Sequence, residues 1–470
     1  MSLTLQDTEV VFETIESGRA ERALAGTDSI GCGYNVFGRY VDPKMTGQLL
    51  FDLGEYEKDW VSGYQKPERV RVQGDKWGEF EHREGSSSRS YQEELKTYVG
   101  LEGEYGFFQG EVEAEFEESH RRCSSFHFVS KTSNAYKYLL RLDDPEEFLT
   151  ERAQADLAER DPEYLFRRYG THYLNSLIIG GCAVFSSATN TASSAKRMDF
   201  SQSAELAYKA GVGSIKVKQG SEQYKQIETF NRNSRSKVRV RGGRPEFGED
   251  ILEGSYQKWI DSIEDDMDWV ALPKVTETLR PIVPIWELCE DDKRREEIEA
   301  YFHEKYAPKF KPEPEPTIAP VYGYSVPNPQ RWRYSLEPDL HGHGWKFHEK
   351  PFFYVSTEPD KDGNDGRVPV YMHSAMDPIR FKLSTEEHES GPQGPWKNDA
   401  DPDGWTGATN PVWYAYPPGA GRGDDSLPIV GHTNPHTSQK CGWFYSEKGD
   451  DRNWTNEGIV FYAEEVKLQD

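Results

Sequence analysis

The chain has 470 residues, more than one hydrophobic core usually supports, so we expect at least two domains. It is acidic, with 56 Lys and Arg against 81 Asp and Glu and a formal charge of −25. This balance argues against a nucleic-acid partner and against simple electrostatic adhesion to anionic lipid. The five cysteines are scattered and fit neither a disulfide framework nor a metal knuckle, so we expect buried or incidental thiols. We also expect no metal and no cofactor.

No run of about 18 apolar residues, the length that a transmembrane helix needs, is present. The N-terminus has neither the basic start nor the apolar core of a secretory signal. We therefore expect a protein that is made soluble and, if it leaves the cell, is released by lysis or secreted by a non-standard route. A chain that has already been processed or trimmed is the alternative explanation.

Residues 1–308 have a mixed pattern that predicts an α+β domain. Strand-like segments alternate with amphipathic helical ones in this part of the chain. The predicted strands include Ser29–Tyr40 and Lys237–Arg241, and the predicted helices include Pro145–Glu159, Pro162–Tyr169 and Ser255–Ile263.

The most specific motif begins at the end of the helix predicted over Pro162–Tyr169. Tyr169-Gly170-Thr171-His172-Tyr173 is followed by a spacer of six residues and then by Gly180-Gly181. The first glycine suits a helix C-terminus, and the glycine pair suits a strand that bends or that another backbone approaches. His172 has no nucleophile and no second histidine at ligand spacing beside it, so we expect it to be a buried structural residue.

This motif resembles the signature of the membrane attack complex/perforin (MACPF) family. Further segments resemble the family in the same order along the chain: Gly31–Asn35, the strand Val238–Arg241 with its glycine pair Gly242-Gly243, and Trp259–Ile263. The resemblance implies a bent central antiparallel sheet with helical clusters, and a sheet hinge at Gly242 and Gly243. It also implies that two segments on either side of the signature change from helices into membrane-inserting β-hairpins.

The first such segment is 95–116. Its apolar residues occupy odd positions and then switch to even positions near Gly106–Gly110, as a hairpin turn would require. The inserting residues would be Val99, Leu101, Tyr105, Phe107, Phe108, Val112 and Phe116. Amphipathic strands of a soluble sheet are the alternative explanation for the same alternation.

In the second segment, 204–218, the apolar residues occupy even positions and then switch to odd positions around its glycines. Its inserting residues would be Leu206, Tyr208, Val212, Ile215 and Val217. The two segments carry opposite charges, which would be neighbours in the lumen of a ring and would fix its register. The charged residues concerned are Glu111, Glu113 and Glu115 in the first segment and Lys209, Lys216 and Lys218 in the second.

Residues 309–318 are rich in proline and glutamate and predict an extended linker. Residues 319–470 then contain three repeats of roughly 50 residues, each strand-rich. Their openings are Ala319–Tyr322, Val368–Tyr371 and Leu427–Val430. A closed pseudo-threefold structure follows, with a β-prism as the leading candidate and a β-trefoil as the alternative.

The aromatic residues of these repeats have two possible roles, as core or as contacts to a target. C-terminal modules of MACPF proteins often bind the target, and the resemblance implies the same here. The candidates for target contact are Trp345, Trp405, Trp413 and Trp454.

The resemblance thus implies a pore-forming toxin, insecticidal or defensive. It would bind the lipid, glycan or protein receptor of a target cell membrane and form a homo-oligomeric ring. Each subunit would then insert two hairpins into a transmembrane β-barrel. The alternative is a non-lytic MACPF protein that recognises a glycan or lipid without insertion. We do not expect an enzyme, because no set of nucleophile, base and orienting residue stands out.

Overall fold

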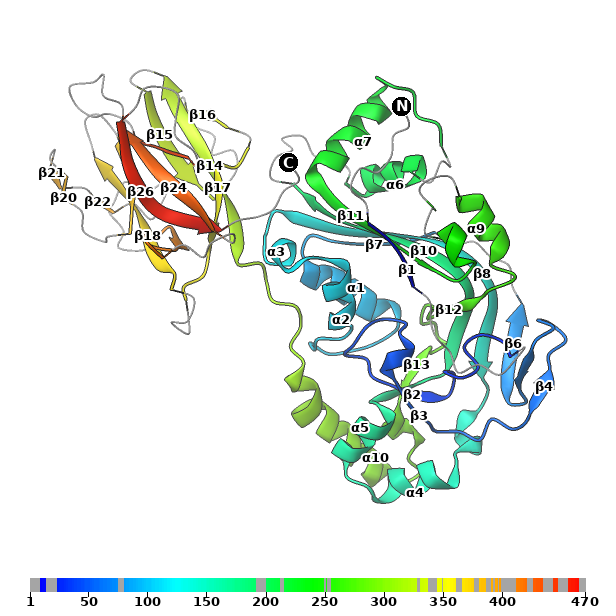
Figure 1. Ribbon diagram of the computed structural model, residues 1–470. Helices are drawn as coiled ribbons and strands as arrows, with labels where there is room; N and C mark the ends of the chain where they lie inside the picture. The colour runs from blue at the N-terminus through cyan, green and yellow to red at the C-terminus, as the bar shows by residue number, and fades with distance from the viewer. Residues whose placement is uncertain are drawn as a thin grey trace. The chain divides into compact units, whose positions relative to one another are not determined.

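A seven-stranded sheet forms the centre of the computed structural model of this chain (Figure 1). Its strands run in the order β1-β11-β10-β8-β6, with β7 paired to β8 and β12 to β10. The long strands β8 and β10 curve strongly along their length, so the sheet is bent (Figure 1). The strand bounds are β1 Glu9–Glu13, β6 Val70–Gly74, β7 Phe80–Gly85, β8 Phe126–Leu142, β10 Ser176–Asn190, β11 Ser234–Arg241 and β12 Asp268–Ala271.

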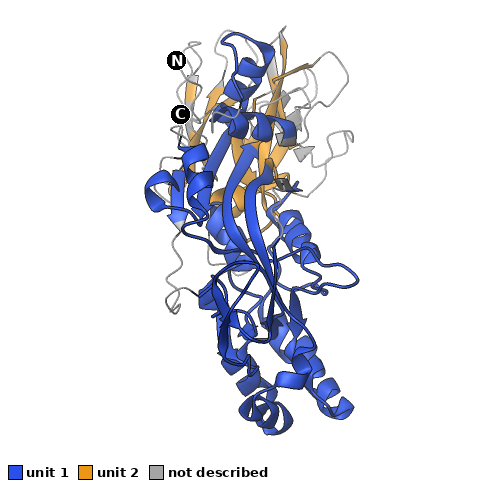
Figure 2. Ribbon diagram, turned by 90° about the vertical axis from the view of Figure 1, so that its right-hand side faces the viewer, with its two compact units in different colours: residues 1–118, 127–189, 199–314 blue, residues 119–126, 190–198, 315–470 orange. Residues whose placement is uncertain are grey.

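The structure describes residues 9–13, 23–74, 80–191, 200–211, 215–248, 251, 255–327, 330–336, 345–348, 350–360, 366–375, 380–385, 390–391, 394–395, 397–398, 411–420, 426–433, 443–446 and 455–464. The chain forms two units (Figure 2). Unit 1 contains residues 1–118, 127–189 and 199–314, and unit 2 contains 119–126, 190–198 and 315–470. The change from unit 1 to unit 2 at 314/315 falls inside the predicted linker 309–318.

In two pairs of neighbouring antiparallel strands, the chain that connects the two strands forms a group of helices. Strands β7 and β8 pair from Phe80↔Ser133 to Gly85↔Phe128, and residues 86–125 lie between them in the sequence. Strands β10 and β11 pair from Cys182↔Arg241 to Thr189↔Ser234, and residues 191–233 lie between those. The first helical cluster contains α1 Ser88–Tyr98, α2 Gln109–Glu115 and α3 Glu118–Arg121, and the second contains α6 Phe200–Gly211 and α7 Glu222–Asn233.

A smaller sheet of four strands carries the first part of the signature motif. Its order is β13-β9-β2-β3, and the predicted strand Ser29–Tyr40 contributes only its middle, β2. The bounds are β13 Ile282–Pro284, β9 His172–Leu174, β2 Cys32–Tyr34 and β3 Thr46–Leu49.

Two predicted helices of unit 1, Pro162–Tyr169 and Ser255–Ile263, are present as α5 and α9. The predicted helix Pro145–Glu159 is divided into a 3-10 helix and an α-helix, because Leu149 pairs with Phe51 and Thr150 caps the second helix. Helix α5 spans Pro162–Tyr169: the Asp161 side chain accepts a hydrogen bond from the backbone NH of Tyr164, and Pro162 occupies the first turn. Gly170 follows with a φ of 83°, a conformation that favours glycine. The remaining elements of unit 1 are η1 Pro43–Met45, β4 Tyr56–Lys58, β5 Gln65–Pro67, η2 Pro145–Phe148, α4 Glu151–Glu159, α8 Pro245–Gly248, α9 Tyr256–Ser262, η4 Ile285–Leu288, α10 Asp292–Tyr301, η5 Phe302–Tyr306 and η6 Ala307–Lys309.

Unit 2 contains a curled sheet in which one pairing pattern occurs three times. The hairpins β14–β15, β18–β19 and β24–β25 pair Tyr322 with Ser335, Tyr371 with Ser384, and Val430 with Ser446. These are equivalent positions of the three sequence repeats. Each hairpin also pairs with the closing strand of its own repeat: β17, β23 or β26. The bounds are β14 Ile318–Pro327, β15 Gln330–Ser335, β16 Lys346–Phe347, β17 Phe353–Ser356, β18 Val368–Ala375, β19 Arg380–Ser384, β20 Ser390–Gly391, β21 Gly394–Pro395, β22 Lys397–Asn398, β23 Trp413–Ala415, β24 Ser426–Thr433, β25 Trp443–Ser446 and β26 Thr455–Glu464.

The repeats share one core, and a nearly cyclic set of hydrogen bonds joins them. The backbone NH of Tyr445 donates to the Tyr334 hydroxyl at 2.9 Å, and the backbone NH of Leu383 donates to the Tyr445 hydroxyl at 2.8 Å. All three residues are almost fully buried. They are equivalent positions of the three repeats, and Leu383 has no hydroxyl with which to complete the cycle. The three-repeat pairing is therefore observed, whereas the assignment to a β-prism stays a prediction.

Candidate functional site

The four glycines predicted at the signature and at the hinge lie together where β10 and β11 meet helix α9. A Cβ placed on Gly242 would be 2.4 Å from the carbonyl oxygen of Gly180, and one on Gly181 would be 2.4 Å from Cδ1 of Ile263. The indole Nε1 of Trp259 donates to the Gly242 carbonyl oxygen at 2.7 Å. Gly242 and Gly243 also have positive φ, 72° and 77°. Only glycine therefore permits this close contact between two strands and a helix.

His172 lies at the junction between helix α5 and the smaller sheet. It is 4% exposed, and its ring makes edge contacts with Trp286 at 5.7 Å and Phe302 at 5.9 Å between ring centroids. Burial, with smaller contributions from the charges of Arg280 and His303, lowers its pKa to about 3. The imidazole is therefore neutral near pH 7 and cannot serve there as a general acid.

The other signature residues are buried at the same junction. The Tyr169 hydroxyl donates to the Asp156 carboxylate at 2.9 Å, and the Thr171 hydroxyl lies 2.9 Å from Nδ1 of His172. Tyr173 makes an edge contact with Phe51 at 5.1 Å, and burial raises its pKa above the usual tyrosine range. These side chains fill the core and are not available to a ligand in this conformation.

The predicted inserting residues of the first segment are folded into the first helical cluster. Val99, Leu101, Phe107, Phe108, Val112 and Phe116 are all buried, whereas Tyr105 is half-buried. Phe108, Val112 and Phe116 recur every fourth residue, a spacing that puts them on one face of a helix and also on one face of a strand. The same sequence is thus compatible with the helix that is present and with the predicted hairpin.

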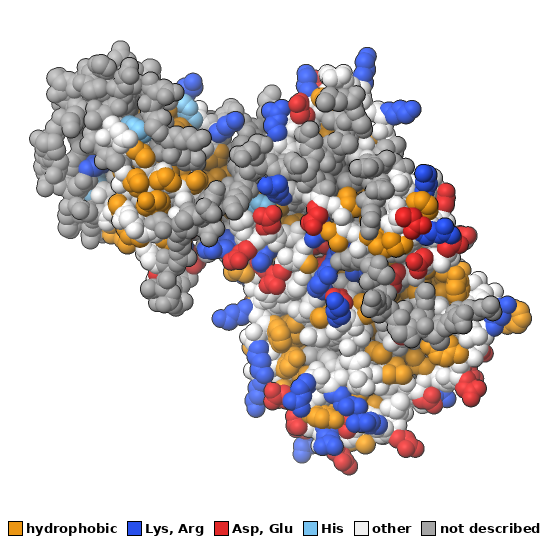
Figure 3. All heavy atoms as spheres, in the orientation of Figure 1, with side chains coloured by type: hydrophobic (Ala, Val, Ile, Leu, Met, Phe, Trp, Pro, Cys, Tyr) orange, Lys and Arg blue, Asp and Glu red, His pale blue; other side chains and the backbone are white. Residues whose placement is uncertain are grey.

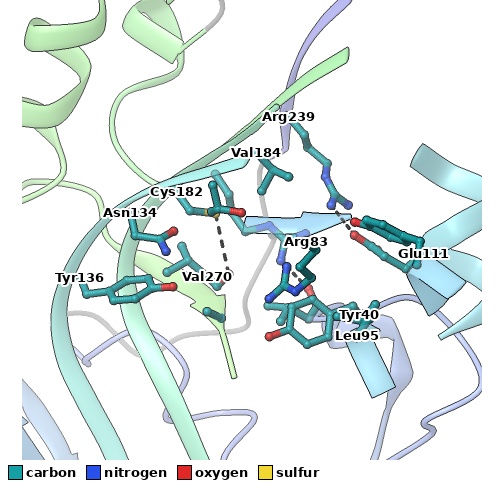
Figure 4. A pocket seen from close by; sticks show the side chains of 15 residues that line it. Tyr40, Arg83, Leu95, Glu111, Asn134, Tyr136, Cys182, Val184, Arg239 and Val270 are labelled. Atoms are coloured by element: carbon teal, nitrogen blue, oxygen red, sulfur yellow. Dashed lines mark hydrogen bonds and ion pairs between the residues drawn. The ribbon is translucent and has the colours of Figure 1, made fainter. Parts of the chain in front are cut away.

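Arg239 of β11 lies between two glutamates of helix α2. Its guanidinium forms ion pairs with Glu111 and with Glu115, which are 4% and 8% exposed. Arg39 adds a further contact to Glu111 at 3.7 Å. Figure 4 shows the Arg239 side chain extending from its strand toward Glu111. The predicted lumen residues Glu111 and Glu115 therefore both contact the central sheet through Arg239 in this conformation, whereas Glu113 is exposed.

The two buried carboxylates have different pKa directions. Burial acts to raise the pKa of Glu111, but the charges of Arg239, Arg39 and Arg241 outweigh it and hold that pKa below its usual value. Burial raises the pKa of Glu115, where Arg239 compensates only in part and the charge of Glu111 adds to the rise. One arginine thus stabilises one ionised carboxylate well and the second one poorly.

A small cavity separates the first cluster from the sheet beside this ion pair (Figure 4). Tyr91, Leu95 and Glu111 line it from the cluster, while Cys182, Val184 and Arg239 line it from the sheet. The cavity has a volume of about 40 Å³, so it is a local gap in the packing between cluster and sheet.

The second cluster is larger than the segment 204–218 predicted from the sequence. Tyr208 is buried, Leu206, Ile215 and Val217 are partly buried, and Val212 lies outside the described residues. Lys209 pairs with Glu205 on its own helix at 2.5 Å, whereas Lys216 and Lys218 are exposed. Helix α7 was missed, although Ser221 as a capping residue and the buried pair Ile227 and Phe230, three residues apart, are helix signals.

Two of the four predicted target-contact tryptophans lie in the described residues, and both pack within unit 2. Trp413 is 2% exposed in the shared core of the repeats, so it is a core residue and its prediction as a contact is corrected. Trp345 is partly buried and packs against Phe381, with 6.0 Å between ring centroids. Trp405 and Trp454 lie outside the described residues.

One exposed apolar hairpin was not predicted. Strands β4 and β5 are joined by a turn in which Trp60 is 91% and Val61 55% exposed, and Tyr56 beside them is 47% exposed.

On the face drawn in Figure 3, acidic and basic side chains are interspersed over unit 1. In the described part of the chain no helix is long and apolar enough to span a membrane, and no group of side chains has the composition of a metal site.

A family profile and one solved structure with a TM-score above 0.5 agree with this geometry. The family profile described as MAC/Perforin domain matches residues 23–273, more than half of the chain. GNIP1Aa from Chromobacterium piscinae has a similar structure, with a TM-score of 0.59, 20% identity, and coverage of 87% of this chain and 85% of that one. A putative cell invasion protein with a MAC/Perforin domain from Bacteroides thetaiotaomicron aligns over 71% of this chain and 70% of its own, with 12% identity and a TM-score of 0.42. A search of curated proteins found no match.

A bent sheet, two strand pairs with helices between their strands, and a close glycine contact between β10 and β11 are features of the perforin-like, pore-forming class. The chain belongs to the MAC/Perforin family.

Proposed function

We propose that this protein is a pore-forming toxin that binds a target membrane, assembles into a ring and extends two β-hairpins per subunit into a transmembrane barrel. The proposal rests mainly on one observation: in two neighbouring strand pairs, β7–β8 and β10–β11, a helical cluster connects the two strands. If each cluster extends, β7 and β8 become one continuous hairpin, and β10 and β11 become another. A barrel satisfies every backbone hydrogen bond within lipid, which isolated strands cannot do.

The side chains of the first cluster support this proposal. Phe108, Val112 and Phe116 are hidden from water in the helical form, and in an extended strand they share the face opposite Glu111, Glu113 and Glu115. A lipid-facing apolar row and a lumen-facing charged row are the pattern of a membrane strand.

The C-terminal unit is proposed to bind the target. Its three repeats pair in one sheet and share one buried core, a scaffold of the kind that can carry recognition loops. The ligand class we propose is a lipid, glycan or protein receptor on the target cell. An insecticidal or defensive role, and release by a non-standard route, remain part of the proposal.

A reversible cross-link tests whether the first cluster must move. A Cβ at Gly100, just after helix α1, would lie 3.1 Å from Cβ of Val275, a few tenths of an ångström less than in a relaxed disulfide. With a small shift of the backbone, Gly100→Cys with Val275→Cys is expected to form a disulfide that ties the cluster to the rest of unit 1. Gly54→Cys with Glu68→Cys is a matched control outside both clusters, because its Cβ separation is also 3.1 Å and Gly54 also has a positive φ.

Dye release from liposomes and from cultured target cells is the measurement. We expect the Gly100–Val275 cross-link to block release until a reductant is added, and the Gly54–Glu68 cross-link to have no effect. Release that continues with the first cross-link closed would contradict insertion of this cluster. Binding without release by the reduced protein would favour the non-lytic alternative.

A further inference from the structure

Residues 310–318 form hydrogen bonds with the first helical cluster and with the residues just after it, so they are not an unattached linker. The contacts fall into two groups, one within unit 1 and one within unit 2, and both involve the backbone of residues 86–125. Proline at positions 312, 314 and 316 favours an extended backbone over this stretch.

The first group of contacts holds the turn between helices α1 and α2. The backbone NH of Gly106 donates to the Phe310 carbonyl oxygen at 2.8 Å. The approach is so close that a Cβ on Gly106 would lie 2.3 Å from the Lys311 carbonyl oxygen. The linker backbone therefore packs directly against the backbone of the cluster.

Gln92 of helix α1 connects the linker to the same turn. Its amide oxygen accepts from the backbone NH of Glu313 at 2.9 Å, and its amide nitrogen donates to the Phe107 carbonyl oxygen at 2.9 Å. Gln92 and Glu313 are each 1% exposed. Separation of the linker from the cluster would leave these buried polar groups without these partners until water reached them.

Stacked rings reinforce this contact. The Phe310 ring lies 4.1 Å from that of Phe37 with 6° between their planes, and Phe107 stacks with Phe37 at 5.2 Å. The Phe37 ring thus packs against the linker and against the first helical cluster.

The second group of contacts lies at the far end of the cluster, just before strand β8. The backbone NH groups of Thr317 and Ile318 both donate to the Arg122 carbonyl oxygen, at 2.9 and 2.8 Å. The Ser124 NH donates in turn to the Ile318 carbonyl oxygen at 2.8 Å. Ile318 is also the first residue of β14, which opens the three-repeat sheet.

We propose that residues 310–318 form a strap that holds the first helical cluster in its folded form. The strap joins the cluster to the first strand of the C-terminal sheet, so a movement of that sheet on its target would be transmitted to the cluster through the backbone. Release of the strap is then the step that permits the cluster to extend, and this step rests on the proposed pore-forming function.

The experiment uses the full chain with two variants, one on each side of the contact. Gln92→Ala removes both bridging hydrogen bonds from the cluster side, and Phe310→Ala removes the stacked ring from the linker side. Gln109→Ala is the matched control, because Gln109 lies in the same cluster but its side chain bonds Glu113 at the exposed surface. Hydrogen–deuterium exchange of peptides from 101–116 is the first readout, and peptides from 176–190 report whether the central sheet stays intact.

We expect both strap variants to speed exchange in 101–116 by roughly tenfold, the effect of losing about two buried hydrogen bonds or one stacked ring, while Gln109→Ala stays at the wild-type rate. Exchange that is unchanged in both strap variants overturns the proposal. Dye release is the second readout, and we expect it to be faster in the strap variants than in the wild type. Faster exchange with an unchanged rate of release overturns the coupling step. Faster exchange with no release by any protein, wild type included, refutes the pore-forming function but supports the strap.

Discussion

Arg239 of the central sheet and Glu111 of helix α2 form an ion pair in which both side chains are buried, 9% and 5% exposed. Glu115 shares the same guanidinium from one helical turn further on. In a strand, Glu111 and Glu115 would lie on one face with Glu113, so extension of the cluster must break the pair with Arg239. Breaking a buried pair is costly unless water or new partners reach both charges.

The two glutamates are expected to respond oppositely to neutralisation. At pH 7, Glu111→Gln should lower the free energy of unfolding by about 2 kcal/mol, because it removes a well-stabilised buried charge partner. Glu115→Gln should raise the free energy of unfolding, because burial raises the pKa of Glu115 and its ionised form is unfavourable in the folded protein. Thermal and denaturant unfolding measure both changes. The exposed Glu113→Gln serves as control, and a destabilised Glu115→Gln would contradict this assignment.

His172 should give the stability of the protein a dependence on pH. Its folded pKa of about 3 lies below the usual 6.5, so the unfolded state takes up the proton first as the pH falls. The contribution of the neutral ring is therefore present above pH 6.5 and is lost as the pH falls from 6.5 toward 3. The maximal slope is about 1.4 kcal/mol per pH unit. His172→Gln should flatten the stability profile in this window, whereas the exposed His82→Gln should leave its slope unchanged. An equal slope in wild type and His172→Gln would contradict the assignment.

Local sequence patterns were enough to predict the parts of the fold that local forces determine. Asp161, Pro162 and Gly170 mark the ends of helix α5, and the structure has that helix within the predicted bounds. The repeat of opening segments predicted three equivalent strand-rich units, and the three hairpins of the structure pair at equivalent positions.

Other features depend on contacts that no local pattern reveals. The spacing of Phe108, Val112 and Phe116 fits a helix and a strand equally, so the pattern alone could not decide between them. Arg239 lies more than a hundred residues from Glu111 in the sequence, and no local pattern of residues predicts an ion pair over that separation. Tryptophan is common both at binding surfaces and in cores, and only the burial of Trp413 shows that it belongs to the core.

The glycine contact at the bend should tolerate no side chain. Gly242→Ala combines a positive φ with a Cβ 2.4 Å from the Gly180 carbonyl oxygen. Gly220→Ala also has a positive φ, 78°, but nothing within 4 Å of the added methyl group, so it measures the backbone cost alone. We expect about 1–2 kcal/mol of destabilisation for Gly220→Ala and at least twice that for Gly242→Ala, by denaturant unfolding. Equal losses would show that the close contact relaxes without cost.

The hydrogen bonds between repeats should stabilise unit 2. Tyr445→Phe removes the acceptor of the Leu383 backbone NH in a fully buried site. We expect a loss of about 1–3 kcal/mol, the cost of an unpaired buried donor. Tyr414→Phe, at a partly exposed tyrosine of the same unit, should cost less than 0.5 kcal/mol, as is usual for surface changes. Unfolding of the full chain, followed by near-ultraviolet circular dichroism, compares the two, and similar losses would contradict a special role for the buried tyrosine.

The proposed pairing of acidic and basic hairpins in the pore is best tested with residues that the soluble form does not bury. Reversal of Glu111 or Glu115 would disrupt the contact with Arg239 before any assembly, so its effect on lysis would not report on the pore. Glu113, Lys216 and Lys218 are exposed. Glu113→Lys alone, or Lys216→Glu with Lys218→Glu, should slow dye release at unchanged thermal stability, because like charges then face each other across neighbouring hairpins. Combining all three reversals should restore release, since opposite charges meet again, and the loss should weaken as salt screens the charges. A triple variant that is slower than either parent would rule out this pairing, whatever the single reversals do.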